Sequence, residues 1–237
     1  MATMTTRILE TKKERMIVTL LLALGIPCSA QLGVILGMLG SVSIGATVLW
    51  AAIVLIVLFI VGFLASKVLP GQTSDFILEI PPMRMPQLSN MSLKTLVRVE
   101  WYLKEAVPLF IVGTLILYVL DKTNGLAAMQ AAAAPVVVTL LDLPAEAANA
   151  FIIGFLRRDY GAAGLLAMQR NGMLDHVQVV VSLVTMTLFV PCIANLLMIV
   201  KERGLKAAIW MSVFIFPFAV LVGAIVNFLI RFSGLTF

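Results

Sequence analysis

The chain has 237 residues, of which 61% are hydrophobic and 12% charged, and its mean hydropathy is +1.08. A soluble domain carries about twice that share of charged residues, so the composition excludes a water-soluble globule and predicts an all-α, multi-pass integral membrane protein. The net charge of +5 comes from short basic clusters beside hydrophobic runs. That pattern is typical of cytoplasmic anchoring, and it argues against a nucleic-acid-binding patch.

The first 66 residues predict a membrane hairpin. Spans are expected at residues 16–39 and 45–66, and each is long enough to cross a hydrocarbon core of about 30 Å. A basic cluster at residues 12–15 precedes the first span and Lys67 follows the second, so both outer ends are expected in the cytoplasm. The first hydrophobic run is too long for a cleavable signal peptide and is expected to remain as a span.

Residues 67–105 predict a cytoplasmic linker followed by an amphipathic helix. Prolines interrupt the linker down to residue 86 and favour an extended path. After Ser89 or Asn90, either a suitable N-cap, apolar residues recur with helical spacing, and Trp101 and Tyr102 would anchor the helix at the membrane surface. The apolar stripe comprises Leu96, Val99, Leu103, Ala106 and Phe110.

Residues 106–237 predict a second membrane unit with irregular spans. A span at about 106–120 is short for a full crossing, and the segments 126–141 and 145–156 are each too short to cross alone. A helical bundle with broken or re-entrant helices is therefore expected.

Two full spans are expected at the end of the chain, at residues 177–200 and 207–230. The basic turn 201–206 between them is predicted to be cytoplasmic. The C-terminus then lies outside, provided that residues 121–176 enter and leave the membrane on one side.

A short motif occurs twice, once in the first span and once in the penultimate span. Residues 26–32 read Ile-Pro-Cys-Ser-Ala-Gln-Leu, and residues 190–196 read Val-Pro-Cys-Ile-Ala-Asn-Leu. Because the two predicted spans run in opposite directions, the repeat indicates inverted-repeat character, which typically places a transport site at the repeat interface.

Each copy of the motif offers sulfur and oxygen together. Proline leaves a carbonyl four residues earlier without its helical donor, at Ala23 in one copy and Thr187 in the other. An amide follows each thiol by three residues, on the same helix face. Sulfur favours softer transition metals over magnesium or calcium. The candidate ligands for a transiently bound metal are Cys28, Cys192, Gln31 and Asn195.

Both thiols are expected near the middle of the bilayer and close to each other. Cys28 lies about 20 Å along a helix from Arg15, and Cys192 lies about 13 Å from Lys201. Their position inside hydrophobic runs argues against a structural disulfide. The alternative is that each cysteine packs as a small hydrophobe beside a proline kink.

Other polar residues are weaker candidates. His176, the sole histidine, precedes the penultimate span and is a candidate ligand where a metal arrives from outside. Arg157, Arg158 and Asp159 interrupt an apolar region, and intramembrane charges are costly unless they face protein or water. A structural role, with Asp159 pairing with an arginine to fix the broken segment, is favoured over cation handling.

Several segments, in chain order, resemble the ferrous iron transport protein B family. They are residues 6–15, 26–30, 79–86, 154–164 and 189–194. The resemblance implies a bacterial or archaeal cytoplasmic-membrane permease, in which a GTPase domain precedes two gate regions of inverted topology. It also implies Fe²⁺ as the transported substrate, handled by Pro-Cys or Cys-x-Pro motifs, with no stably bound cofactor.

The sequence departs from the family in two parts, the GTPase domain and the first gate. No Gly-x-x-x-x-Gly-Lys-Ser/Thr phosphate-binding loop occurs in the sequence, so this chain is not expected to be an enzyme that hydrolyses GTP. The first gate also has no counterpart, and the expected partner is a GTPase and first-gate subunit or a missing N-terminal part. Self-association, a non-conducting scaffold for a GTPase, and a nucleoside-type permease stay open, although the repeated motif favours a metal.

Overall fold

The elements follow from the hydrophobic runs of the chain. The computed structural model describes residues 6, 9, 11–70, 87–123, 125–189 and 192–233, which form helices and no strand. The helices are α2 (Lys12–Gly25), α3 (Ser29–Val42), α4 (Ile44–Val68), α5 (Leu88–Lys122), α6 (Gly125–Leu141), α7 (Ala145–Leu156), α8 (Arg158–Arg170), α9 (His176–Leu188), α10 (Ile193–Arg203) and α11 (Leu205–Ser233). The prediction of an all-α, multi-pass membrane protein is confirmed.

Most of the predicted spans correspond to stretches of helix that are long enough to cross a membrane. Within the described ranges, the stretches that are long and apolar enough to span are Lys12–Val42, Ile44–Val68, His176–Arg203 and Leu205–Phe232. Two further apolar pieces, Ala128–Leu141 and Ala145–Phe155, meet at a bend of 116°. The expected broken or re-entrant helices are therefore present.

The two motif-bearing spans are interrupted at the motifs, although the sequence predicted each as one continuous element. The first divides into α2 and α3 around Ile26, Pro27 and Cys28, and the second divides into α9 and α10 between Leu188 and Ile193. Proline removes a backbone donor and clashes with the preceding turn, which explains the first break. Val190 and Pro191 lie outside the described residues.

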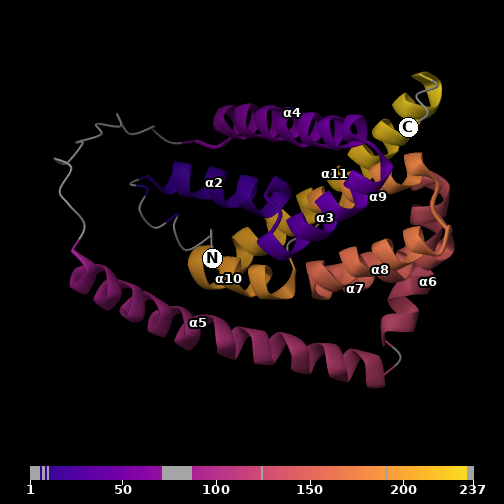
Figure 1. Cartoon of the computed structure of the whole chain (residues 1–237). Coiled ribbons are helices and arrows are strands. Elements are labelled where there is room, and N and C mark those ends of the chain that lie inside the picture. Colours follow the sequence, from indigo (N-terminus) through magenta and orange to yellow (C-terminus); the bar gives the residue numbers. More distant parts are fainter. Residues whose placement is uncertain are drawn as a thin grey trace.

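The two interrupted spans run in opposite directions, as the sequence predicted (Figure 1). The middle of α2 lies beside the end of α10, where Arg203 Nε donates to Thr19 Oγ1 at 3.2 Å. Further along, α3 lies beside α9, and Gln31 Nε2 donates to the carbonyl oxygen of Met186 at 3.5 Å. The two breaks therefore occur at the same level of the bundle.

Helix α5 joins two segments that the sequence divided. One continuous 35-residue helix replaces the predicted amphipathic helix and third span, and Pro108 lies inside it. Leu96, Val99 and Trp101 are exposed, so this part of the stripe faces lipid or solvent and not the bundle. The side chain of Tyr102 and the prolines of the linker at residues 71–86 lie outside the described part of the chain.

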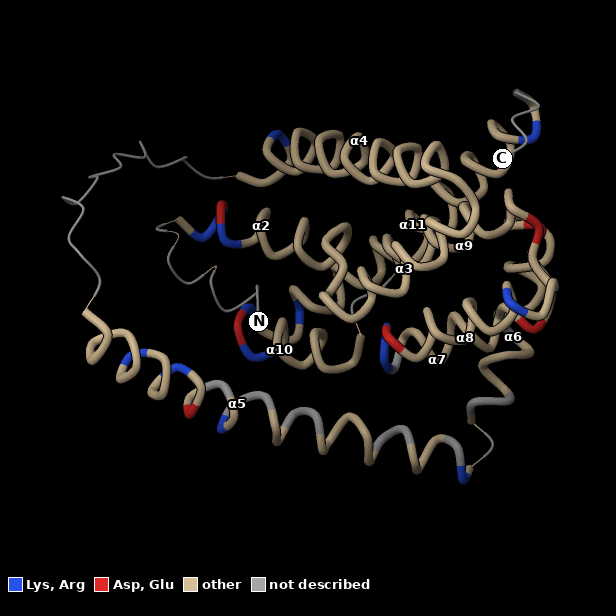
Figure 2. The backbone as a smooth tube through the Cα atoms, in the orientation of Figure 1, with Lys and Arg blue, Asp and Glu red and all other residues tan. Residues whose placement is uncertain are grey.

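Basic residues gather at one end of the bundle. Figure 2 shows the start of α2 and the ends of α4 and α10 together on one side, and these carry Lys12, Lys67 and Arg203. The opposite end holds an ion pair between Asp142 and Arg231. Helix α5 ends and α9 begins toward this second end (Figure 1), so residues 121–176 leave and return on the same side.

This arrangement makes the predicted topology testable. A cysteine placed at Lys206, in a background without the native cysteines, is expected to resist an impermeant thiol reagent in intact cells, because positive clusters stay in the cytoplasm. The same reagent is expected to label a cysteine at Asn171, an exposed residue of the turn at the opposite end. Labelling at position 206 without permeabilisation would contradict the scheme.

Candidate functional site

A helical hairpin carries charged residues to the level of the two breaks. Helices α7 and α8 are joined at Arg157, whose extended backbone ends one helix and begins the other. The hairpin is tightly closed because Gly161 packs against the backbone of Gly154 and Ala150, with no room for a side chain. Small residues allow such close approach of helices in membranes.

The tip of this hairpin places Arg158 between the two interrupted spans. Arg158 is 7% exposed, and its Nη2 donates to the carbonyl oxygen of Ala23 at 3.0 Å and to that of Phe189 at 2.8 Å. Ala23 lies in the last turn of α2, and Phe189 caps the end of α9. Helix C-termini present a partial negative charge, so the guanidinium lies where two such ends converge.

The sequence identified the Ala23 carbonyl correctly as one released by proline, but it expected that oxygen to be available to a metal. The structure shows that the oxygen accepts a hydrogen bond from Arg158. For the second copy, the structure describes a hydrogen bond at the Thr187 side chain, whose Oγ1 accepts from Trp50 Nε1 at 3.2 Å. Trp50 of α4 thereby fixes the last turn of α9.

The two thiols lie at equivalent positions, each as the N-cap of the second half of its span. Cys28 caps α3 and accepts a hydrogen bond at Sγ from the backbone N–H of Gln31 at 3.5 Å, and Cys192 caps α10. Both thiols are free; Cys28 is exposed and Cys192 half-buried. Each predicted cysteine therefore lies at a break where a preceding carbonyl, that of Ala23 or Phe189, accepts a hydrogen bond from Arg158.

The two predicted amides differ in their surroundings. Gln31 is completely buried, and its donation to the Met186 carbonyl ties α3 to the last turn of α9. Its Oε1 accepts no hydrogen bond from the described part of the chain. Asn195 is half-buried on α10.

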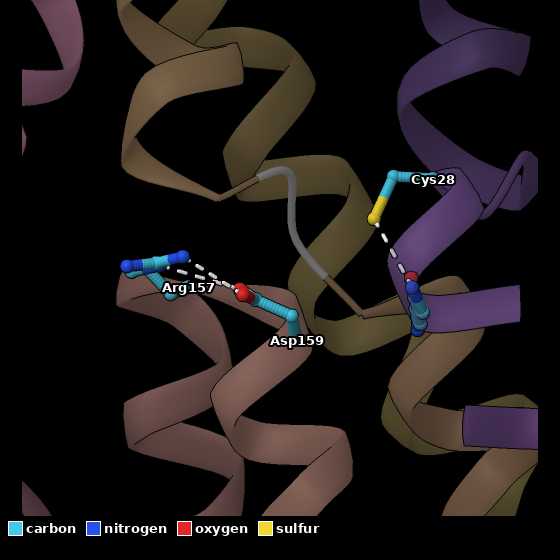
Figure 3. A network of polar contacts seen from close by, with 4 residues as sticks. Cys28, Arg157 and Asp159 are labelled. Atoms are coloured by element: carbon cyan, nitrogen blue, oxygen red, sulfur yellow. Dashed lines mark hydrogen bonds and ion pairs between the residues drawn. The ribbon is translucent and has the colours of Figure 1, made fainter. Parts of the chain in front are cut away.

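Arg157 and Asp159 form an ion pair at the hairpin tip, with Arg157 Nη2 2.9 Å from Asp159 Oδ2. The Arg157 guanidinium also lies over the ring of Tyr160, 4.2 Å from its centroid. Figure 3 shows the Asp159 carboxylate pointing toward Arg157 and away from Cys28. The pair therefore neutralises and fixes the tip, and it does not contribute a carboxylate to the thiols.

His176 lies apart from the thiols. It is exposed at the start of α9, and the length of that helix, about 20 Å, separates it from the break. There it lines an open cavity of about 460 Å³ together with Gln169 and Arg170 of α8. Among the residues that the structure describes, no three His, Cys, Asp or Glu side chains gather as a metal site.

Sequence reasoning missed the position of Arg158. A charge at membrane depth is costly unless it has a polar partner, so the sequence indicated that Arg158 must have one. It could not identify the partners, because they are 135 and 31 residues away in the chain. The aromatic cluster beside the α9 break was also missed. Phe189 makes edge contacts with Phe151 and Phe216, at centroid distances of 5.6 and 4.5 Å.

Two family models match the chain in adjacent segments. The model described as the C terminus of ferrous iron transport protein B matches residues 47–98, and the gate model described as nucleoside recognition matches residues 103–206. Neither a curated protein nor a solved structure matches the chain. The first match begins in α4 and ends in α5, while the second contains the hairpin tip, α9 and the second motif.

Proposed function

Because the chain belongs to the ferrous iron transport protein B family, as part of its C-terminal membrane portion, we propose that it forms part of the membrane path for Fe²⁺. The observation that supports this most strongly is the meeting of two Pro-Cys interruptions, in antiparallel spans, at one level of the bundle. Discontinuous helices of this kind form the ion sites of many transporters. The membrane is proposed to be the cytoplasmic membrane of a bacterium or archaeon.

The chemistry of the centre suits a transported ion more than a resident one. Cys28 and Cys192 supply sulfur, which favours Fe²⁺ over magnesium and calcium, and nearby carbonyl and amide oxygens supply weaker ligands. A conduction site must release its ion, so one or two thiols mixed with oxygens fit better than a closed thiolate cage. Gln31 and Asn195 are proposed as the accompanying amides, and His176 stands outside this centre.

Fe²⁺ movement is proposed to need a partner. The family relationship implies coupling to a GTPase, and this sequence contains no phosphate-binding loop. We expect membrane vesicles containing the chain alone to take up no more ⁵⁵Fe²⁺ than empty vesicles, whereas co-expression with a GTPase and first-gate subunit of the same family gives GTP-dependent uptake. Uptake by the monomeric chain alone would contradict this requirement.

The match to a gate model described as nucleoside recognition makes nucleoside transport the second candidate. A nucleoside needs an aromatic face for its base and several hydrogen-bonding side chains, and the aromatic rings near the centre, Phe151, Phe189 and Phe216, pack against one another. Measuring radiolabelled nucleoside uptake in the same co-expression vesicles separates the candidates. Nucleoside uptake without Fe²⁺ uptake would reject the iron path, and uptake of neither would favour the scaffold role.

A further inference from the structure

The carbonyl oxygens of Ala23 and Phe189 converge on one positive charge. They come from the C-terminal ends of α2 and α9, two half-helices whose axes approach the centre from opposite ends of the bundle (Figure 1). Each end carries partial negative charge. In transporters with discontinuous helices, unwound carbonyls and half-helix C-termini coordinate cations, and here the cation is the side chain of Arg158.

Backbone carbonyls contact the guanidinium, and each of the two breaks also carries a thiol. Each thiol caps the half-helix that begins on the other side of its break, five residues after Ala23 in one span and three residues after Phe189 in the other. Arg158 is more than nine-tenths buried. Asp159 lies next in sequence, but it pairs with Arg157. If the guanidinium moved away, it would release the Ala23 and Phe189 carbonyls, and a thiol lies at each of the same two breaks.

We propose that the Ala23 and Phe189 carbonyls, with Cys28 and Cys192 beside them, form a cation site that Arg158 fills in this conformation. A divalent ion then enters only after the guanidinium withdraws, because one site cannot hold both charges. This inference rests on the proposed function. It assigns Arg158 a specific task, which is to keep the path closed to small cations while the hairpin tip is docked.

Binding of Co²⁺, a stable substitute for Fe²⁺, tests the proposal on the full chain in lipid nanodiscs. Thiolate-to-cobalt absorption reports whether sulfur is a ligand. Arg158→Gln removes the charge but keeps an amide donor for the carbonyls. We expect this variant to bind Co²⁺ at least about tenfold more tightly than the wild type, because Coulomb repulsion from a buried charge at contact distance exceeds that factor.

The matched control is Arg170→Gln, which makes the same charge change on the same helix. Arg170 is exposed at the other end of α8, about 18 Å away, and its replacement is expected to leave Co²⁺ affinity at the wild-type value. Adding Cys28→Ser and Cys192→Ser to Arg158→Gln is expected to abolish the gain and the absorption band.

The outcomes separate this proposal from the proposed function. If the wild type and Arg158→Gln bind Co²⁺ with equal, cysteine-dependent affinity, Arg158 does not block the site. Weaker binding by the variant would likewise overturn the blocking role and would indicate that Arg158 stabilises the thiolates. Either result is still compatible with an iron site at the cysteines. Binding of Co²⁺ by neither protein, with both folded, would reject the metal site itself and the blocking role with it.

A second measurement needs no substitution and covers the case in which Arg158→Gln does not fold. Phenylglyoxal modifies accessible arginines, and peptide mass spectrometry can follow Arg158 in the wild type. Co²⁺ is expected to increase the modification of Arg158 severalfold, because the ion displaces the guanidinium, while Arg170 serves as the internal reference. Unchanged or reduced modification of Arg158 at saturating Co²⁺ would contradict the proposal.

Discussion

Iron transport by the complete system is expected to fall at least about tenfold when Cys28→Ser and Cys192→Ser are combined. Serine keeps the approximate size of the side chain and its ability to cap a helix, but a hydroxyl is a hard, neutral ligand that gives no preference for Fe²⁺. Even partners outside the ligand shell typically change metal affinity or activity by 10- to 100-fold, so removal of both sulfurs should do no less. The measurement is GTP-dependent ⁵⁵Fe²⁺ uptake in vesicles that contain the partner subunit.

Two controls test whether the loss of uptake comes from the missing sulfur and not from misfolding. Protein amount and thermal unfolding should stay at wild-type values, because both cysteines are free and neither is fully buried. Asn195→Ala is expected to reduce uptake by a smaller factor, and it is a cleaner test of an amide than Gln31→Ala, because Gln31 also joins α3 to α9. Wild-type uptake by the double serine variant would return both cysteines to a packing role.

The sequence predicted the elements that depend on local hydrophobicity and charge. The spans expected at residues 45–66 and 207–230 agree within a few residues with α4 and α11, because a run of about 20 apolar residues is long enough to cross a bilayer as one helix. The bend between α6 and α7 was also expected, since each of these two segments is too short to cross the membrane alone. The opposite directions of the motif spans followed from counting crossings between basic clusters.

Features that depend on contacts between distant residues were not predicted. The amphipathic pattern of α5 changes to an apolar one near residue 106, which suggested two elements, but nothing there terminates a helix, and Pro108 is accommodated inside α5. Likewise, the Pro-Cys motif indicated freed carbonyls but not their partner. That partner is Arg158, which the fold of the α7–α8 hairpin brings from far along the chain.

The hairpin that delivers Arg158 depends on one glycine, and Gly161→Ala is expected to lower the stability of the protein by about 2 kcal/mol. A methyl group there would lie 2.5 Å from the carbonyl oxygen of Ala150 and 2.7 Å from the backbone nitrogen of Gly154. These are backbone atoms, so α7 and α8 would have to separate, and overpacking of this kind costs about 1–3 kcal/mol. The loss is expected even though alanine is the better helix former by about 1 kcal/mol.

Gly33→Ala is the matched control, because Gly33 lies in α3 with no atom within 4 Å of the added methyl group. There the helix preference acts alone, so the control is expected to be neutral or slightly stabilising. The two substitutions thus differ in sign, and thermal unfolding of both variants in the same detergent measures the difference. If Gly161→Ala unfolds at or above the temperature of Gly33→Ala, the helices of the hairpin are not in close contact, and the docking of Arg158 at the α2 and α9 termini must have another cause.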